Sequence, residues 1–315
     1  MMLFIDLGDD GDAMRFRKLD LNLLVVLDAL IAEQSVSQAA RRLHLTQPAV
    51  SNALARLRQH FHDDLLVKRG RQMMPTPLAT SLRAPVRDAL LQVQSIAEAR
   101  PYFDASTAEL EFTIVASDYV SATFLPKAVR RLTSVAPGIR INVVPLSERN
   151  FARLEHGEVD LAITPLDVPE SVHPSCPLFE EKFTSIAWSR NNDIPERLSL
   201  DAYLAQTHVV AEFDDSRDML PFDAVYLRER GHERKIAAVA FNFTLLPHMV
   251  VGTPYLATVQ ARLAKQYLKT MPLKIVSPQI DFPIIAERLQ WHHNRDRDLA
   301  NMWLRDFLTG IAATH

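Results

Sequence analysis

The sequence predicts a helical amino-terminal head followed by a larger α/β body. The chain has 315 residues, more than one hydrophobic core usually accommodates, so two or three domains are expected. Apolar residues recur with helical spacing from Leu23 to about Asp104. From Leu110 onward, short β-rich runs alternate with amphipathic segments. That alternation is typical of a mainly parallel sheet covered by helices.

The composition is that of a globular protein, with 48% hydrophobic and 23% charged residues. No run approaches the roughly 18–20 apolar residues of a membrane helix. The first 14 residues are acidic and lack the basic start of an export signal, so we expect a disordered leader and a cytoplasmic protein. Cys176 is the single cysteine. A single cysteine excludes an internal disulfide and a thiolate zinc site. Cys176 is therefore either an inert loop thiol or a sensor.

The net charge of −3 conceals an uneven distribution along the chain. Between Arg15 and Arg87 there are 12 Lys and Arg against 5 Asp and Glu, a balance of +7 that leaves −10 elsewhere. A basic head on an acidic body is consistent with nucleic-acid binding, although a local excess can also be a solvated surface.

Three helices are predicted in the head. The first has an apolar stripe, and the second opens with a Ser35-x-x-Gln38 capping box and buries small residues. Thr46 caps the third, with Pro48 in its first turn. The inward-facing residues are Leu23, Leu27, Leu30 and Ile31 on the first helix, Ala39, Ala40 and Leu43 on the second, and Val50, Leu54 and Leu57 on the third.

The outer arc of the third helix is polar, slender and mostly uncharged. It comprises Gln47, Pro48, Ser51, Asn52, Ala55, Arg58 and Gln59. Amide and hydroxyl side chains can hydrogen-bond to base edges in the major groove, while arginines contact phosphates. A plain helical hairpin is the alternative.

Residues 65–76 predict a short basic hairpin that turns at Gly70 and carries Lys68, Arg69 and Arg71 at its tip. Cations beside a recognition helix are placed to contact the flanking DNA backbone, though an isolated run of charge is usually a solvated turn. Together with Arg56 and Arg58, these three residues are the expected source of salt-sensitive affinity.

A helix with proline at its first position, Pro77, follows the hairpin. Its apolar residues are spaced 3, 4, 3, 4 and 3 apart: Ala79, Leu82, Val86, Ala89, Val93 and Ile96. This heptad seam favours pairing with a second copy over packing on its own body. Pro85 should bend the helix.

Six strands are predicted in the body, and a lapse of the pattern near 164–189 suggests two lobes joined by crossing segments. The strands are Glu111–Ala116, Arg140–Val144, Val159–Ile163, His208–Ala211, Ile236–Ala240 and Leu256–Val259. Ligands of such sheets usually lie beyond the carboxyl ends of the strands.

Candidate effector-binding residues follow those strand ends. Ser117, Tyr119 and Thr123 open a helix whose hydroxyl and N–H groups could meet an anion, although Thr123 could simply cap it. Phe243 and Asn242 combine an apolar wall with an amide, as an aromatic ligand needs, and of Phe241 and Phe243 one is expected in the core. Thr164 and His208 complete the set. His208 could titrate near neutrality, or be structural.

The runs SVSQAARRLHLTQPAVSNALARLR and LLVKRGRQMMPTP closely resemble the winged helix-turn-helix of LysR-type transcriptional regulators. The resemblance continues through SDYVSATFLPKAV, GEVDLAI and the stretch from ATVQARLA to WHHNRDRDLANMWLRDFL. These segments are similar to the subgroup that contains nodulation regulators and regulators of aromatic-compound degradation.

The resemblance implies that Gln47, Pro48, Ser51 and Asn52 lie in the major groove and Arg69 at the wing. It also implies a two-lobed effector domain like a type 2 periplasmic binding protein, with the inducer in the cleft, and tetramers built as dimers of dimers. The expected domains are a leader at 1–14, a winged helix-turn-helix at 15–76, a linker at 77–104 and the effector domain at 105–315.

Motifs of enzymes and cofactor sites are missing from the sequence. There is no G-x-S-x-G, phosphate-binding glycine loop, G-x-G-x-x-G or H-E-x-x-H. His292 and His293 are adjacent, and adjacent side chains of a strand point to opposite faces, so no metal is expected there. The resemblance treats this segment as a subgroup signature. We therefore expect neither catalysis nor a cofactor.

The sequence as a whole predicts a DNA-binding transcriptional regulator, an activator, that responds to a small aromatic inducer. Its expected partners are double-stranded DNA with an interrupted inverted repeat, a second copy of itself through the linker helix, and RNA polymerase. The alternative is a cytosolic binding or catalytic α/β protein whose head serves only dimerisation.

Overall fold

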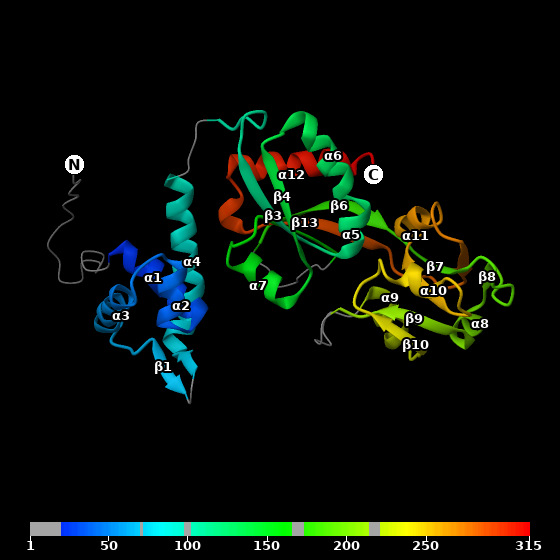
Figure 1. Cartoon of the computed structure of the whole chain (residues 1–315), viewed down its shortest axis with the longest axis horizontal. Coiled ribbons are helices and arrows are strands. Elements are labelled where there is room, and N and C mark those ends of the chain that lie inside the picture. The colour runs from blue at the N-terminus through cyan, green and yellow to red at the C-terminus, as the bar shows by residue number, and fades with distance from the viewer. Residues whose placement is uncertain (1–19, 70–71, 98–101, 166–172, 214–220) are drawn as a thin grey trace. The chain divides into compact units, whose positions relative to one another are not determined.

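The computed structural model describes residues 20–69, 72–97, 102–165, 173–213 and 221–315, in two compact units that divide between Glu98 and Ala99 (Figure 1). The expected leader at 1–14 lies outside these ranges. No helix in them is both long and apolar enough to cross a membrane.

The first unit contains four helices and one hairpin: α1 (Leu21–Glu33), α2 (Val36–Arg42), α3 (Gln47–Phe61), β1 (Leu66–Arg69), β2 (Gln72–Pro75) and α4 (Pro77–Ala97). Ser35 caps α2 by accepting from the N–H of Gln38, and Thr46 caps α3 by accepting from that of Ala49. Both predicted caps are therefore confirmed. They satisfy amide groups that a helix start leaves without partners.

The predicted inward stripes form the core of this unit. Leu27, Leu30, Ala39, Val50 and Leu57 are fully buried in one cluster. Helix α4 joins the same cluster through its first half, where Ala79 and Val86 are buried and Leu82 packs against it. Arg87 on α4 also pairs with Asp28 on α1, with 3.3 Å between Nη1 and Oδ2.

Only part of the heptad seam therefore packs on its own body. Farther along α4, Val93 and Ile96 are 44% and 76% exposed.

The second unit has two lobes, each a mixed sheet covered by helices (Figure 1). The strand order in the first lobe is β4-β3-β5-β13-β6, and in the second β10-β9-β11-β7-β12-β8. Strands β3, β4 and β5 are parallel, and so are β9, β10 and β11. Strand β13 is antiparallel to both of its neighbours, as is β7.

The bounds of the strands are β3 (Leu110–Ala116), β4 (Ile139–Pro145), β5 (Leu161–Thr164), β6 (Ser175–Glu181), β7 (Phe183–Trp188), β8 (Arg197–Leu198), β9 (Thr207–Ala211), β10 (Lys235–Ala240), β11 (Leu256–Gln260), β12 (Leu273–Pro278) and β13 (Ile285–Gln290). The helices are α5 (Asp118–Thr123), α6 (Leu125–Val135), α7 (Glu148–Glu155), α8 (Leu200–Ala205), α9 (Phe222–Glu229), α10 (Leu246–Val250), α11 (Ala261–Tyr267) and α12 (Leu299–Ala312), with the 3-10 turn η2 (His293–Arg295).

Two segments pass between the lobes. Strand β6 runs into β7 with only Lys182 between them, and β12 leads into β13. The expected crossing segments are thus confirmed, but their strands were not predicted. Strand β6 was missed because it contains Pro177, and a proline inside a segment argues against a strand. Pro177 pairs with Arg288 at a register irregularity between Glu287 and Arg288. The crossing strands make both sheets mixed rather than mainly parallel.

Candidate nucleic-acid interface and effector cleft

Helix α3 presents the polar face that the sequence predicts. Gln47, Pro48, Ser51, Asn52 and Arg56 are all exposed. The helix contains no acidic residue, and its inner residues are buried. Gln47 is oriented by the neighbouring helix, because Ser37 Oγ lies 3.3 Å from its Oε1. The face combines amides, a hydroxyl and a cation on a rigid element, which suits contact with base edges and phosphates.

Arg56 and Arg58 differ in their surroundings. The side chain of Arg56 is 59% exposed and pairs only loosely with Asp20, at 3.8 Å. Arg58 is half-buried, and its guanidinium donates to the backbone carbonyls of Asp64 at 2.8 Å and Leu66 at 2.9 Å. The prediction that Arg58 lies on the outer arc is corrected: it joins α3 to the base of the hairpin.

The predicted hairpin is present, with β1 antiparallel to β2 and Arg69 paired with Gln72 at its end. Lys68 and Arg69 are exposed, whereas Arg71 lies outside the described residues. The base of the hairpin is fixed by Asp63, which accepts from Thr76 Oγ1 at 2.7 Å and from the N–H of Leu65 at 2.6 Å. The two described cations therefore stand on an anchored ribbon beside α3.

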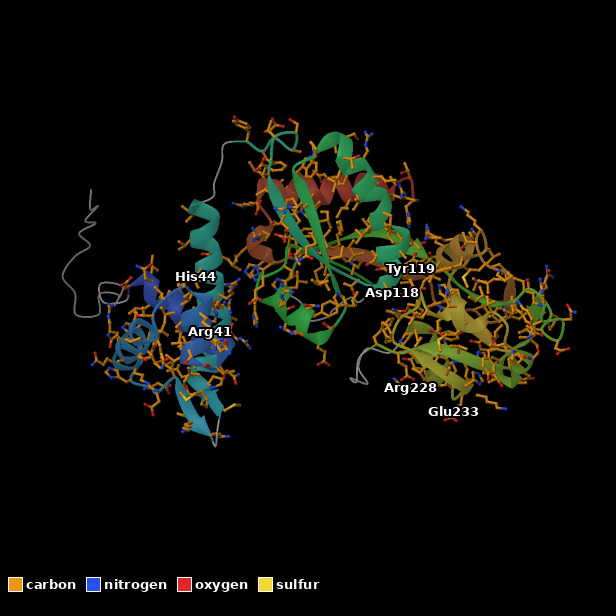
Figure 2. All side chains as sticks on the ribbon, viewed as in Figure 1. Arg41, His44, Asp118, Tyr119, Arg228 and Glu233 are labelled. Atoms are coloured by element: carbon orange, nitrogen blue, oxygen red, sulfur yellow. The ribbon has the colours of Figure 1, made fainter. Side chains whose placement is uncertain are left out.

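Two further polar side chains on the head were not predicted. Figure 2 shows Arg41 and His44 at the end of α2, and both are exposed. Arg42 instead pairs with Glu33 at 3.2 Å and with Asp28 at 3.8 Å. Adjacent arginines read alike in the sequence, and only the tertiary structure shows that Arg42, although also exposed, forms these two ion pairs.

In the second unit, the candidates of α5 have internal contacts. Ser117 caps the helix by accepting from the N–H of Val120 at 3.2 Å. Thr123 is buried and donates to the carbonyl of Tyr119 at 2.8 Å. Tyr119 is also buried, and its hydroxyl donates to Glu181. The prediction that Tyr119 and Thr123 face a ligand is therefore corrected, because their hydroxyl protons are used inside the lobe.

The hydroxyl of Tyr119 belongs to a buried polar group at the crossing between β6 and β7. Arg262 donates to the same carboxylate, with 3.1 Å between its Nη1 and Glu181 Oε2. Glu287 is buried nearby on β13. Burial, followed by the charge of Glu181, raises the pKa of Glu287 to about 8. Burial is also the main reason that the pKa of Tyr119 is raised. Sequence reasoning missed this group, since its members come from distant segments.

His208 is a structural histidine. It is fully buried on β9, its Nε2 lies 2.9 Å from the carbonyl of Tyr203, and the two rings are in edge contact at 4.6 Å. Burial lowers the pKa of His208 to about 4. Of the two alternatives for His208, the burial and the contact with Tyr203 favour the structural histidine, because an imidazolium there would lose its hydration without gaining an anion.

The remaining effector candidates are either buried in the core or act as caps. Phe243 is core, as expected for one member of its pair, whereas Phe241 is 74% exposed. Asn242 caps a turn by accepting from the N–H of Leu245 at 3.1 Å. Thr164, at the end of β5, is 1% exposed. Of the predicted effector residues, only Ser117 and Asn242 are not fully buried, and both act as caps.

Asp118 was not predicted, yet it joins the two lobes at their strand ends. It is the first residue of α5, labelled with Tyr119 in Figure 2, and its Oδ2 accepts from the N–H of Thr244 at 2.7 Å. Its Oδ1 is buried, with no hydrogen-bond donor among the described residues. The one signal in the sequence was its place after a strand: β3 ends at Ala116, shortly before Asp118, and β10 ends at Ala240, shortly before Thr244.

Two other features lie away from these strand ends. A groove of about 530 Å³ runs along β4 and α6, lined in part by Glu111, Val129 and Arg140. Cys176 lies in β6 rather than in a loop, and burial raises the pKa of its thiol. A raised pKa lowers the thiolate fraction, which disfavours the sensor interpretation.

The helix-turn-helix, the wing and the two-lobed body define a class of protein that sequence comparison also identifies. Residues 21–80 match the bacterial regulatory helix-turn-helix family model of the lysR type, and residues 106–312 match the LysR substrate binding domain. The chain therefore belongs to the LysR family of DNA-binding transcriptional regulators. Its homologues are regulators rather than enzymes, as predicted.

Within that family, the chain is similar to Nodulation protein D 2 of Rhizobium tropici, at 41% identity over 94% of this chain and 93% of the relative. It is also similar to the crystal structure of a probable transcriptional regulator from Pseudomonas aeruginosa, with 29% identity, a TM-score of 0.62 and coverage of 93% and 97%. Full-length CbnR complexed with its target DNA shares the fold, with a TM-score of 0.52, 14% identity and coverage of 93% and 100%. The predicted nodulation-regulator resemblance is confirmed.

Proposed function

We propose that this regulator is an inducer-responsive activator that binds an interrupted inverted repeat through α3 and the β1–β2 hairpin. The observation that carries the proposal is the exposed, acid-free face of α3 beside two exposed cations. Gln47, Ser51 and Asn52 contact base edges, with Thr46 and Pro48 setting the start of the helix. Arg56, Lys68, Arg69 and Arg71 contact phosphates.

Pairing through α4 supplies the two-fold symmetry. Val93 and Ile96 are exposed at the end of a seam whose first half is already buried, so a second copy can cover them. Two recognition helices then read half-sites about one helical turn apart. A tetramer needs a second contact surface, and the exposed edge strand β4 with its groove offers one. As an activator in the cytoplasm, the bound oligomer contacts RNA polymerase.

The inducer in this proposal is a small hydroxylated aromatic molecule bound where the lobes meet. Phe241 offers an exposed ring at the end of β10, and Asp118 Oδ1 is a buried acceptor for which the described residues provide no donor. A phenolic O–H donates to such an oxygen, whereas a carboxylate would be repelled by it. Ser117, Asn242 and Thr244 lie at the same strand ends.

The ligand acts by a population shift. A phenol that bridges Asp118 and Phe241 binds one arrangement of the lobes more tightly than another, and its differential affinity sets how far the equilibrium moves. Within an oligomer, that arrangement alters the spacing of the recognition helices and the bend of the DNA.

A mobility-shift assay on the promoter nearest the gene tests the DNA interface. We expect a sequence-selective complex that Asn52→Ala weakens at some base positions and not at others. A complex whose base preference is the same with and without Asn52 would place the reading face elsewhere. Absence of any selective complex would favour a head that serves only dimerisation.

A thermal-shift screen of phenols, methoxylated analogues and aromatic acids tests the inducer. Phenols should raise the melting temperature, and Asp118→Asn should abolish the effect while Asp281→Asn, at an exposed aspartate, retains it. Phe241→Ala should weaken binding and Tyr102→Ala, at another exposed ring, should not. Stabilisation by aromatic acids alone, or equal stabilisation of Asp118→Asn, would contradict the proposed contact.

A further inference from the structure

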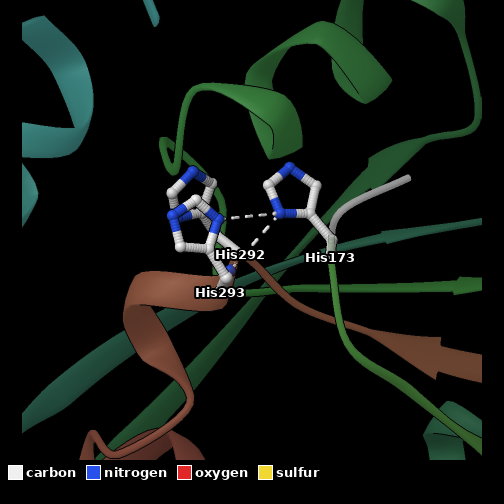
Figure 3. A group of neighbouring side chains, drawn as sticks. All are labelled: His173, His292 and His293. Carbon is white, nitrogen blue, oxygen red and sulfur yellow. Dashed lines mark hydrogen bonds between the residues drawn. The ribbon is translucent and has the colours of Figure 1, made fainter. Parts of the chain in front are cut away.

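Three histidines from segments more than a hundred residues apart meet in the first lobe, at the start of β6 and the end of β13 (Figure 3). We propose that His173, His292 and His293 bind a divalent transition-metal ion of the zinc type. Each ring offers one nitrogen, and these nitrogens lie within 4.8 Å of one another. The site is independent of the proposed DNA and inducer contacts.

Strand register brings the histidines together. Gln290, the last residue of β13, pairs with Ser175, the first of β6, and the N–H of Trp291 donates to the carbonyl of Pro174 at 3.2 Å. His292 follows Trp291 and His173 precedes Pro174, so the same register brings His292 beside His173.

The expectation that adjacent histidines cannot share a metal rested on a strand, and that premise is wrong. Strand β13 ends at Gln290, and His292 caps the 3-10 turn that begins with His293. The turn stacks the two rings, with 4.3 Å between centroids and 29° between planes. Both rings therefore lie on the same side, toward His173.

One nitrogen pair already has the spacing of metal ligands, and the other distances, up to 4.8 Å, close by rotation of the stacked rings. Nδ1 of His173 and Nδ1 of His293 are 3.4 Å apart. Two imidazole nitrogens bound to one tetrahedral Zn²⁺ at about 2.0–2.1 Å are separated by roughly 3.3–3.4 Å. The hydrogen bonds that the metal would replace are long. The backbone N–H of His293 lies 3.3 Å from His173 Nδ1, and that of Asn294 lies 3.3 Å from His292 Nδ1.

A carboxylate already orients one ligand. Glu155, the last residue of α7, has its Oε2 3.1 Å from His173 Nε2. A proton held on Nε2 leaves Nδ1 with the lone pair that a metal requires, and carboxylate–histidine–metal triads are built in this way. The His173 side chain is 2% exposed, so the ring has little freedom to turn away.

The donor set selects the kind of ion. Imidazole suits zinc, copper and nickel, whereas Ca²⁺ and Mg²⁺ require several oxygen ligands. Three protein ligands leave a fourth position for water or a small ligand. Because β13 is antiparallel to β5, the carboxyl end of β13 lies at the amino end of β5, away from Thr164. A metal there would link the crossing strands at the opposite end of the sheet from the proposed inducer contact at Asp118.

The experiment uses the full chain without a histidine tag, freed of metal with a chelator. Zn²⁺ is titrated in competition with a chromophoric chelator, and Co²⁺ serves as a spectroscopic probe. We expect one equivalent per chain, tetrahedral Co²⁺ absorption and a Zn²⁺-dependent rise in melting temperature. Glu155→Gln, which keeps all three rings, should weaken binding by about 10–100-fold, and His173→Asn and His293→Asn by more.

His248→Asn, at an exposed histidine of the same unit, is the matched control and should bind as the wild type does. The cooperative unfolding transition followed by tryptophan fluorescence, which reports on the second unit, shows that each variant is folded. One equivalent that persists in His173→Asn/His293→Asn, or no Zn²⁺ binding by folded wild-type protein at micromolar concentration, would overturn the site and leave a stacked histidine cluster.

Discussion

On α3 the polar side chains predicted to contact DNA are exposed to solvent, whereas most of the effector-binding residues predicted in the second unit are buried and hydrogen-bonded within their own fold. Ser51 and Asn52 are exposed, while Thr164 and His208 are at most 1% exposed. The difference reflects how each surface is built. A DNA-reading face is one side of a single helix, but an effector cleft is assembled from strand ends that also need caps and internal contacts.

The contrast has an energetic consequence. Substitutions on α3 should change binding with little effect on folding, since the replaced groups contact water. Substitutions at the buried polar residues of the second unit should change folding and its pH dependence. All three tryptophans, Trp188, Trp291 and Trp303, lie in the second unit, so their fluorescence reports on its unfolding alone.

The largest effect is expected at Glu287, whose folded pKa is about 8 against 4.5 for the free carboxyl. Between those values the unfolded chain loses a proton that the folded chain keeps, so stability falls as pH rises from about 4.5 to 8. The difference corresponds to about 5 kcal/mol. Glu287→Gln should remove this slope in urea titrations followed by tryptophan fluorescence. Glu180→Gln, at an exposed neighbour on β6, should retain it. An unchanged slope in Glu287→Gln would mean that this carboxyl is not held neutral.

His208 should produce the opposite slope. Its pKa is lowered from 6.5 to about 4, so the unfolded chain binds a proton that the folded chain excludes. The free energy of unfolding therefore keeps its full value, as far as His208 is concerned, above about pH 6.5. It declines by about 3 kcal/mol as pH falls toward 4. His208→Gln should flatten the acid side of the stability curve, measured by the same unfolding assay. His248→Gln serves as the exposed control. Equal acid sensitivity in both variants would refute a neutral, buried His208.

On the head, Ser51→Glu should lower promoter affinity by about 100-fold or more without changing the unfolding transition. The new carboxylate would face the phosphates and base acceptors of the groove. Thr270→Glu adds the same charge at an exposed position of the second unit and should leave affinity within a few-fold. Fluorescence anisotropy with labelled promoter DNA measures both. Comparable losses in the two variants would indicate a general charge effect rather than a contact face.

The smallest effect is expected at Arg69, which the sequence predicts, like Arg58, to be a source of salt-sensitive affinity. Arg69→Ala should reduce the slope of log affinity against log salt by about 0.9, one phosphate contact, and leave stability unchanged. Arg58→Ala should instead cost about 2–3 kcal/mol of head stability, because two charge-assisted hydrogen bonds to backbone carbonyls are lost. Salt titrations and circular dichroism at a helical wavelength distinguish the two. A normal salt slope in Arg69→Ala would remove the hairpin from the DNA interface.

Local pattern was sufficient for the regular elements. The spacing of Val50, Leu54 and Leu57 predicted both the buried side of α3 and its exposed arc, because 3.6-residue periodicity fixes which side chains share a face. The caps at Ser35 and Thr46 and six strands of the body (β3, β4, β5, β9, β10 and β11) were predictable for the same reason: each depends on residues a few positions apart.

Contacts between distant segments were decided by the tertiary structure. Pro177 concealed a crossing strand, Asp118 became a link between lobes only once β3 and β10 ended near each other, and His173 met His292 through the register of β6 and β13. Burial likewise determined the protonation of His208 and Glu287. By itself the sequence determined the family, the exposed polar face of α3 and the two-lobed plan, because those are set by short-range periodicity and motif. The polar centres required the fold, since desolvation and pairing depend on neighbours that sequence order does not bring together.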